Sequence, residues 1–493
     1  MKKIHLHKEP DLIGKYKAFP YQKEAFEAIK DLEYAAIFHE QGLGKTKIAI
    51  DLLLYWLKCT SIDTVLIVTK KQLVANWMNE FKEHTMIVPA VLDTNRKTNY
   101  YVFCGPARVV ITNFEVIISE KERFDLYLKT RNVAIIIDES TKLKNPKSNL
   151  TQTFFEFSSL FKKRVIMTGT PIANRPYDIW AQIYFLDQGK SLGKDFKKFK
   201  LDTDLSNQLA EDKKMQENFE ENLSAIYPKI KHFSVRETKK NGVVHLPDKV
   251  YINETVDFTL KQEQLYHQVC EELSVEIVKD GERIMDDSTA IVKRLLRLVQ
   301  VASNPRLIDE SYDGESAKEK ILDNLIQNIL KNGEKCIVWS NFIGNIDYFA
   351  YKYREYGTAK IHGKMHINER NREIDFFKKD ECKILFATPP AAKEGLTLTM
   401  ANHVIFYDRG FSLDDYLQAQ DRIHRISQKK TCYIHNIIIN GSVDEWIAAL
   451  LEAKQNAAFL AQGDLIRETY KKRIDYSFGE MIKMILSQGN FEE

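Results

Sequence analysis

Short, almost uninterrupted runs of apolar residues recur along this chain, and they constrain its fold more than any other feature. In the first half they alternate with segments whose apolar residues recur at helical spacing. A strand buried on one face only would alternate apolar with polar residues, so continuous runs indicate strands that are covered on both faces. Helical crossovers cover a parallel sheet in this way. These runs are Tyr34–Phe38, Thr64–Thr69, Arg108–Thr112, Val133–Ser140 and Lys163–Thr170.

A second series of such runs follows a long interval of polar or helical segments, from about Ile179 to Leu330. The chain has 493 residues, which exceeds the roughly 250–300 residues at which a single core stops growing. We therefore predict an α/β protein of two lobes, each a parallel sheet covered by helices, with helical protrusions between them. The second series consists of Lys335–Ser340, Ala359–Gly363, Lys383–Thr388, His403–Asp408 and Tyr433–Ile439.

We place the boundary between the two lobes after residue 240. The N-terminal lobe would cover residues 1–240 and include a helical protrusion at about 180–230. The C-terminal lobe would cover residues 241–493, with a protrusion at about 258–310 and further helices at about 443–493.

Composition excludes several classes of protein. The six cysteines are scattered singly, without the paired spacing of a zinc site or the density of a disulfide framework. The N-terminal segment MKKIHLHKEPDL lacks an apolar signal-peptide core, and no run of about 18 apolar residues could span a membrane. We expect a cytoplasmic protein, of a bacterial cell or of a virus-infected host cell. The net charge of +3 does not by itself indicate a nucleic-acid partner.

The segment HEQGLGKTKIAI, residues 39–50, carries the groups that a phosphate-binding loop needs. Glycines let backbone N–H groups converge on phosphate oxygens, a lysine offsets the negative charge, and a hydroxyl binds Mg²⁺. Gly42, Gly44, Lys45 and Thr46 supply these groups, although the first glycine of the general pattern is absent. The alternative is a tight turn with a solvated lysine. The strand–loop–helix context favours the phosphate loop.

Two acidic residues end the run AIIIDEST. Asp138 would hold Mg²⁺, and Glu139 would orient or deprotonate the water that attacks the γ-phosphate. The carboxyl ends of parallel strands are where α/β folds bind ligands. One acidic strand end alone would mean little, but together with the phosphate loop this pair predicts hydrolysis of a nucleoside triphosphate.

The order of these segments resembles the superfamily-two helicase-like motors, and within them the Swi/Snf-type double-stranded-DNA translocases. The resemblance covers approximately Tyr16 to Leu450 and implies two RecA-like lobes. FPYQKEAF resembles the adenine-contacting segment, while GLGKT and DEST resemble the ATP-binding motifs. VLIVTKKQLVANWMNEF and VVITNFEVI resemble the strand-tracking motifs, and MTGTPIANRP resembles the segment that couples hydrolysis to lobe movement.

The second half carries further matches. IVWSNF, KIHGKMHINERNREIDFF and ILFATPPAAKEGLTLTMANHVIFYD are similar to the second-lobe motifs of the family, and YLQAQDRIHRISQ is the most specific match. In phosphoryl transfer, an arginine from an opposing surface neutralises charge on the γ-phosphate oxygens. The resemblance assigns this role to Arg422 and Arg425, for which a solvated surface role is the alternative.

The middle of the chain supports the Swi/Snf subtype in particular. HFSVRETKKNGVVHLPDKVYINETVDFTLKQEQLYHQV resembles the stretch that ends the first lobe with an arginine-rich turn, followed by a strand and a helix. The sequence departs from the family pattern at four positions, and those at His39, Thr141 and the fifth motif leave ATP hydrolysis as the expectation but the details of coupling open. His39 replaces a usual acidic residue, Thr141 a usual histidine and Ser427 a usual glycine, and the fifth motif has only Gly395.

The resemblance implies a set of functional residues. Catalytic roles fall to Lys45, Asp138, Glu139, Arg422 and Arg425; nucleotide binding to Gln22, Gly42, Leu43, Gly44, Lys45, Thr46, Gly395 and Gln418; Mg²⁺ to Thr46 and Asp138; and coupling to Thr168, Gly169 and Thr170. A motor that tracks a strand contacts phosphates without reading bases. We nominate Lys70, Lys71, Asn113, Ser340, Asn341, His362, Gly363 and Thr388 for DNA, with helix capping or a surface role as the alternative for each.

The sequence thus predicts a monomeric, ATP- and Mg²⁺-dependent motor that acts on DNA, double-stranded or forked, without a membrane partner. Translocation on duplex DNA is the main hypothesis. A strand-separating helicase and a fork-remodelling or annealing motor would share this core. From another class, an ATP-gated DNA-binding switch or recruitment subunit stays open. Trp77, Phe114, Trp339 and Trp446 could stack on bases, but we interpret them mainly as core, since Trp77 and Trp446 lie among apolar residues at helical spacing.

Overall fold

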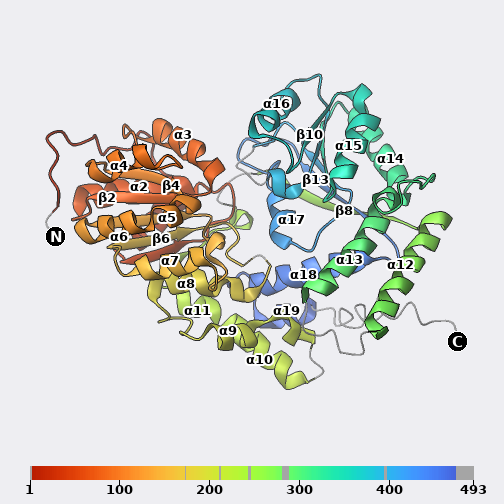
Figure 1. Ribbon diagram of the computed structural model, residues 1–493, viewed down its shortest axis with the longest axis horizontal. Helices are drawn as coiled ribbons and strands as arrows, with labels where there is room; N and C mark the ends of the chain where they lie inside the picture. Colours follow the sequence, from red (N-terminus) through yellow and green to blue (C-terminus); the bar gives the residue numbers. More distant parts are fainter. Residues whose placement is uncertain are drawn as a thin grey trace. The chain divides into compact units, whose positions relative to one another are not determined.

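The computed structural model describes residues 3–172, 174–209, 212–242, 246–279, 288–392 and 397–473. They divide into two compact units, shown in Figure 1. The first unit contains Met1–His245 and Asn456–Lys472, and the second contains Leu246–Gln455. The division falls five residues after the predicted boundary, and the segment Asn456–Lys472, which we had placed in the C-terminal lobe, belongs to the first unit.

The first unit is built on a seven-stranded parallel sheet in the order β3-β4-β2-β5-β6-β1-β7. Its strands are β1 (Tyr34–Ile37), β2 (Thr64–Thr69), β3 (Ala90–Val91), β4 (Val109–Asn113), β5 (Val133–Asp138), β6 (Lys163–Met167) and β7 (Ser234–Val235). The five strands predicted from apolar runs are all present. The two others have two residues each, too few to produce a recognisable run.

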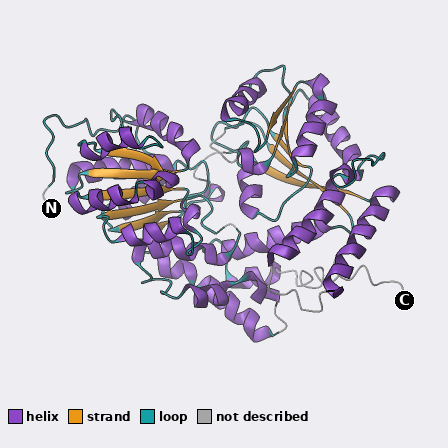
Figure 2. Ribbon diagram, viewed as in Figure 1, coloured by secondary structure: helices purple, strands orange, loops and turns teal. Residues whose placement is uncertain are grey.

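Helices lie on both faces of this sheet, as Figure 2 shows. They are α1 (Pro20–Ile29), α2 (Lys45–Cys59), α3 (Val74–His84), α4 (Arg96–Cys104), α5 (Phe114–Ser119), α6 (Lys121–Thr130), α7 (Asn149–Ser158) and α8 (Ile179–Asp187). Val65 and Ile67 of β2 share one core cluster with Trp77 and Phe81 of α3. Leu66, which points to the opposite face, is equally buried, so the continuous apolar runs are explained by burial on both sides. A helical extension follows with α9 (Phe196–Thr203), α10 (Lys213–Ser224) and α11 (Ile226–Ile230).

The second unit contains a six-stranded parallel sheet in the order β10-β11-β9-β12-β13-β8. Its strands are β8 (Lys249–Val256), β9 (Cys336–Trp339), β10 (Thr358–Ile361), β11 (Ile384–Ala387), β12 (His403–Phe406) and β13 (Cys432–Ile439). The helices are α12 (Leu260–Lys279), α13 (Ser288–Ser303), α14 (Ala317–Lys331), α15 (Ile343–Lys352), α16 (Ile367–Phe377) and α17 (Leu413–Gln420). The helix α18 (Val443–Ala461) belongs to this unit as far as Gln455.

Alternate residues of β9 enter two different cores. Ile337 packs with residues of α16 and α17 in one cluster, and Val338 packs with residues of α14 and α15 in another. The second sheet is therefore covered on both faces, and the predicted pair of RecA-like α/β lobes is confirmed. Among the helices that the structure describes, none is both long and apolar enough to cross a membrane.

The segment that returns to the first unit is held there by polar contacts. Asp464 accepts a 2.8 Å hydrogen bond from Nε of Arg236, and the fully buried Tyr470 of α19 (Arg467–Arg473) donates to Gln208 at 3.0 Å. We expected the helices at about 443–493 to belong to the C-terminal lobe. Hydrogen bonds between residues more than 220 positions apart instead hold this segment against the first unit.

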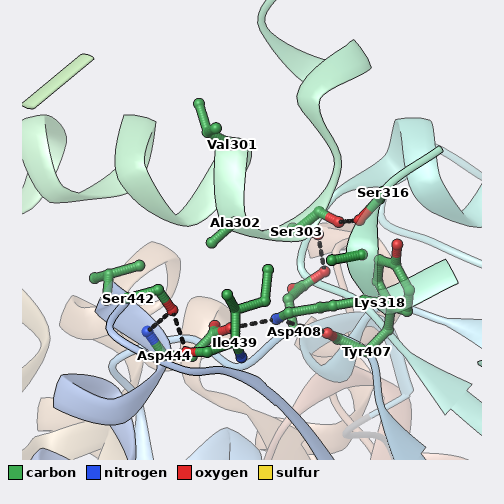
Figure 3. Close-up of polar contacts among 12 residues, drawn as sticks. Val301, Ala302, Ser303, Ser316, Lys318, Tyr407, Asp408, Ile439, Ser442 and Asp444 are labelled. Carbon is green, nitrogen blue, oxygen red and sulfur yellow. Dashed lines mark hydrogen bonds and ion pairs between the residues drawn. The ribbon is translucent and has the colours of Figure 1, made fainter. Parts of the chain in front are cut away.

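A buried ion pair anchors the start of α18, as Figure 3 shows. Nζ of Lys318, on α14, lies 2.7 Å from Asp444 Oδ2 and donates to the carbonyl oxygen of Tyr407 at 3.1 Å. Asp444 also accepts from the backbone N–H of Ile439 at 3.1 Å. Both charged side chains are almost fully buried, so each requires the other to offset its loss of hydration.

We expect Lys318→Met to destabilise the protein by about 3 kcal/mol, because it keeps the apolar stem but leaves the Asp444 carboxylate buried without a counter-charge. Urea unfolding followed by circular dichroism measures the change. Lys320→Met, on the same helix at an exposed position, serves as the control. Equal urea midpoints for the two variants would contradict the assignment.

Candidate functional site

The loop after β1 has the backbone geometry of an anion-binding turn. Gly42 and Gly44 have φ angles of +86° and +68°, and Gly44 forms the N-cap of α2. A Cβ on Gly44 would lie 2.2 Å from Nε2 of Gln22, so a larger residue would displace the Gln22 side chain and would also be strained by the positive φ angle. Backbone N–H groups at the start of a helix point out of its N-terminal end, and phosphate oxygens suit them as acceptors.

Side chains of the N-terminal segment hold this loop. The hydroxyl of Tyr21 and the amide of Gln22 both donate to the carbonyl oxygen of Leu43, at 3.1 and 3.4 Å. Oε1 of Gln22 accepts from the backbone N–H of Phe19 at 2.9 Å. The rings of Phe19 and Tyr21 are parallel, with centroids 6.0 Å apart. Gln22 and Leu43 therefore join the predicted base-reading segment to the phosphate loop.

Lys45 begins α2 and bends back over the loop. Its Nζ donates to the carbonyl oxygens of His39 and Glu40 at 3.0 and 3.4 Å. Thr46, half-buried, stands next to it in the same helical turn. Burial, with a smaller contribution from the Lys45 charge, lowers the pKa of His39 to about 4. His39 is thus neutral near pH 7 and adds no charge to the loop.

The acidic pair lies at the carboxyl end of β5. Asp138 Oδ2 accepts hydrogen bonds from the indole N–H of Trp77 at 2.9 Å and from the hydroxyl of Thr69 at 3.3 Å. Burial and the neighbouring Glu139 raise the pKa of Asp138 to about 6, opposed by these two hydrogen bonds and by Lys45. Glu139 has φ +57°, a left-handed conformation that costs on the order of 1 kcal/mol in a residue other than glycine.

These donors fit a magnesium ion held together with phosphate oxygens. Mg²⁺ typically takes one or two carboxylates and completes its shell with substrate phosphates and water. Within the part of the chain that the structure describes, no three or more His, Cys, Asp or Glu side chains gather in a metal-binding arrangement. An ion at this site would therefore rely on Asp138, the hydroxyl of Thr46 and the phosphates.

The predicted coupling segment, Thr168–Thr170, forms a loop that follows β6 and contacts the phosphate loop. A Cβ on Gly169 would lie 2.7 Å from Cγ of Gln41 and 3.3 Å from Nζ of Lys45, so glycine permits this approach. The backbone N–H of Thr170 donates to the hydroxyl of Thr168 at 3.2 Å. The structure thus brings the nucleotide, acidic and coupling residues that we nominated in the first unit to one edge of the sheet.

The DNA candidates of the first unit follow β2 and β4 at that same edge. Nζ of Lys70 lies 3.9 Å from Oε2 of Glu139, and Lys71 is exposed at the start of the next turn. Asn113 is buried, and its side chain accepts from the N–H of Val116 to cap α5. Capping is thus the interaction that Asn113 makes within this chain.

Among the second-unit candidates, Ser340 and Asn341 are bound to a buried carboxylate. The hydroxyl of Ser340 and both the backbone and side-chain N–H groups of Asn341 donate to Asp408. Ser340 is fully buried, so its hydroxyl serves this network. Thr388 is nearly buried at the end of β11, where its backbone N–H donates to Ile361.

His362 and Gly363 follow β10 at the corresponding edge. His362 is mostly buried, with Nε2 3.7 Å from Oδ1 of Asp347, and burial lowers its pKa. Gly363 is exposed, and a Cβ there would meet nothing within 4 Å. Backbone at Gly363 is therefore accessible to a large ligand.

The arginine pair lies just after α17. Arg422 Nε donates to the carbonyl of Gln418 at 3.1 Å. Arg425 donates to the carbonyl of Asp421 at 3.2 Å and to the hydroxyl of Thr397 at 2.8 Å. Gly395 lies outside the described residues. Both guanidinium groups belong to the second unit.

Two residues near the site were not nominated from the sequence. Trp77, interpreted as core, is buried but also binds Asp138. Lys239 donates its backbone N–H to Glu40 at 2.9 Å, and its Cε lies 3.8 Å from where a Cβ of Gly42 would be. The basic run RETKK was a signal for Lys239. Only the pairing of β7 with β1 places that run beside the phosphate loop.

Family comparisons cover most of the chain. The model of the SNF2-related domain matches residues 21–307, and that of the helicase conserved C-terminal domain matches residues 317–427. The mouse SWI/SNF-related matrix-associated actin-dependent regulator of chromatin subfamily A member 1 is 28% identical over 472 residues, which is 90% of this chain and 43% of that protein.

Two further relatives and one solved structure are similar over comparable lengths. The yeast ISWI chromatin-remodeling complex ATPase ISW1 is 27% identical, over 83% of this chain and 37% of its own. A putative ATP-dependent helicase/translocase of Bacillus subtilis is 26% identical, over 88% and 48%. This chain thus spans less than half the length of these relatives. The Sulfolobus solfataricus SWI2/SNF2 ATPase core in complex with dsDNA has 24% identity and a TM-score of 0.43, over 96% of this chain and 99% of that one.

We expect Trp77→Phe to raise the Mg²⁺ concentration needed for half-maximal ATP hydrolysis by about tenfold, because Asp138 loses the N–H group that orients it. ATPase rates measured across a Mg²⁺ titration test this. Trp56→Phe is the matched control, since it removes a buried indole N–H bonded to the carbonyl of Lys30, away from the acidic pair. Equal Mg²⁺ titrations for the two variants would contradict a role for Trp77 at Asp138.

Proposed function

The chain belongs to the family of SNF2-related domains, and on that premise we propose that it is a DNA-dependent ATPase that uses ATP and Mg²⁺ to translocate along double-stranded DNA. One observation carries the proposal. The phosphate loop, the buried Asp138 with Glu139, and the Gly169 loop meet at the carboxyl edge of one parallel sheet. That edge is where α/β sheets bind nucleotides.

Each group has a separate task in the proposed reaction. The turn at Gly42 and Gly44 and the ammonium of Lys45 bind the phosphates. Asp138 and Thr46 would hold Mg²⁺, which when bound would supply positive charge that offsets the charge of the transferring phosphoryl group. Glu139 orients the attacking water and accepts its proton.

Lys70 supports a dependence of hydrolysis on DNA. It follows β2 in the first strand-tracking motif, and its ammonium lies 3.9 Å from Glu139. In the proposed cycle a DNA phosphate binds this ammonium and draws it from the carboxylate. The Glu139 carboxylate then leaves its ion pair with Lys70 and can contact the attacking water instead.

The second unit contributes the remaining functions in this proposal. Arg422 and Arg425 stabilise the charge of the γ-phosphate when the lobes close, and product release reopens them. The turns after β9, β10 and β11 contact the phosphate backbone without reading bases. The names of the mouse and yeast relatives refer to chromatin, and that of the Bacillus relative refers to an ATP-dependent helicase/translocase. These names support an ATP-dependent motor that acts on DNA.

We expect blunt duplex DNA to stimulate ATP hydrolysis more strongly than single-stranded DNA, forked duplex or duplex RNA. The comparison needs steady-state rates at one low salt concentration, since phosphate contacts make every affinity salt-dependent. Stimulation by single-stranded or forked DNA alone would favour a helicase or an annealing motor. Nucleotide-dependent DNA binding without stimulated turnover would favour an ATP-gated switch.

Glu139→Gln is expected to lower kcat by about 10²–10⁴-fold, because the amide cannot accept the proton of the attacking water. Binding of a fluorescent ATP analogue should be retained, since the phosphate loop is unchanged. Glu115→Gln, exposed on α5, controls for the loss of one charge. A Glu139→Gln protein that turns over at the full rate would refute the proposed chemistry.

A further inference from the structure

The side chain of Gln182 connects two loops of the proposed ATP site. It lies on α8, is fully buried, and makes three hydrogen bonds. Its Oε1 accepts from the hydroxyl of Ser140 at 2.8 Å. Its Nε2 donates to the carbonyl oxygens of Pro171 and Asp178, each at 3.0 Å. One amide therefore ties the acidic loop, the coupling loop and the start of α8 together.

The partners fix the orientation of this amide. The carbonyl oxygens of Pro171 and Asp178 only accept, so they must face the NH₂ group. The remaining carbonyl of the amide must then accept, and the Ser140 hydroxyl is its donor. Ser140 is fully buried as well, so loss of this bond would leave a polar group without a partner in the interior.

Ser140 directly follows Glu139, whose backbone is in the strained left-handed region. Such a conformation persists only where surrounding contacts hold it. The Ser140–Gln182 hydrogen bond immobilises the residue next to the strained one, and thus restricts where the Glu139 carboxylate can point. A shift of about 1 Å in a catalytic group can reduce rates by about 10²-fold, so this restriction matters for chemistry.

On the other side, Gln182 holds Pro171, which directly follows the loop Thr168–Thr170. In that loop, Gly169 packs against Gln41 and Lys45 of the phosphate loop. One buried amide therefore joins the residue that follows the coupling loop to the residue beside Glu139. The contacts are short, and all of them lie within the first unit.

We infer that Gln182 is a positioning residue that holds Glu139 in its hydrolytic orientation and transmits the position of the Thr168–Pro171 loop to it. The inference rests on the proposed ATPase function and adds a residue that touches neither nucleotide nor metal.

The test compares Gln182→Met, Ser140→Ala, the double variant and the wild type. Methionine keeps the length of the side chain but can neither donate nor accept the three bonds. Gln182→Met is expected to lower kcat about tenfold with unchanged binding of a fluorescent ATP analogue and a smaller ratio of DNA-stimulated to basal rate. Ser140→Ala is expected to lower kcat in the same direction. The double variant should be no slower than the slower single variant, because both changes break one connection.

Ser158→Ala is the matched control. Its buried hydroxyl donates to the carbonyl oxygen of Phe185 at 2.7 Å. Phe185 lies on α8, the helix that also carries Gln182, but this hydrogen bond does not involve the acidic loop. Ser158→Ala should lower the melting temperature and leave kcat unchanged. Ser140→Ala keeps the inference testable if Gln182→Met does not fold.

Three outcomes would overturn the inference: equal loss of kcat in Gln182→Met and Ser158→Ala, a full-rate Ser140→Ala protein, or effects of Ser140→Ala and Gln182→Met that multiply. In each of these cases wild-type hydrolysis would still stand, so the proposed function would survive. A wild-type protein that hydrolyses no ATP with or without DNA would refute both.

Discussion

Burial of each parallel sheet on both faces is the constraint on which the rest of this structure depends. Strand interiors must be apolar because neither face meets water, so functional polar groups can enter only where a strand ends. Since all strands are parallel, their carboxyl ends collect at one edge. The phosphate loop, the acidic pair and the coupling loop follow β1, β5 and β6, which are neighbours in the order β5-β6-β1. The site is therefore a consequence of strand order.

The polar groups at these edges are stabilised by hydrogen bonds from deeper layers. Asp138 is buried and would be costly as an anion without the N–H of Trp77, the hydroxyl of Thr69 and the charge of Lys45. The second unit follows the same rule at the end of β12, where Asp408 accepts from Ser303, Ser340 and Asn341. In both units a buried carboxylate organises a turn that follows a neighbouring strand.

An element or a site residue could be predicted from the sequence only where a short contiguous stretch of the chain carries its pattern. The run Thr64–Thr69 coincides with β2 because six consecutive buried residues leave a clear pattern. Strands β3 and β7 escaped prediction because two residues leave none. Lys45 and Asp138 were found because their motifs are contiguous. Trp77 and Gln182 were not assigned to the site, since a buried tryptophan or glutamine in an apolar helix looks the same whether or not its polar end meets a catalytic loop.

The amino-acid sequence by itself determined the two α/β lobes, their parallel sheets and the residues of the phosphate loop and the acidic pair. These follow from periodicity and from glycine, lysine and carboxylate chemistry at fixed short spacings. Only the tertiary structure decided that Gln182 connects Ser140 to Pro171, that Lys239 lies beside Gly42, and that Asn456–Lys472 belongs with the first unit. These contacts join residues far apart in the chain, so strand order and helix packing determine them, and no local pattern records the result.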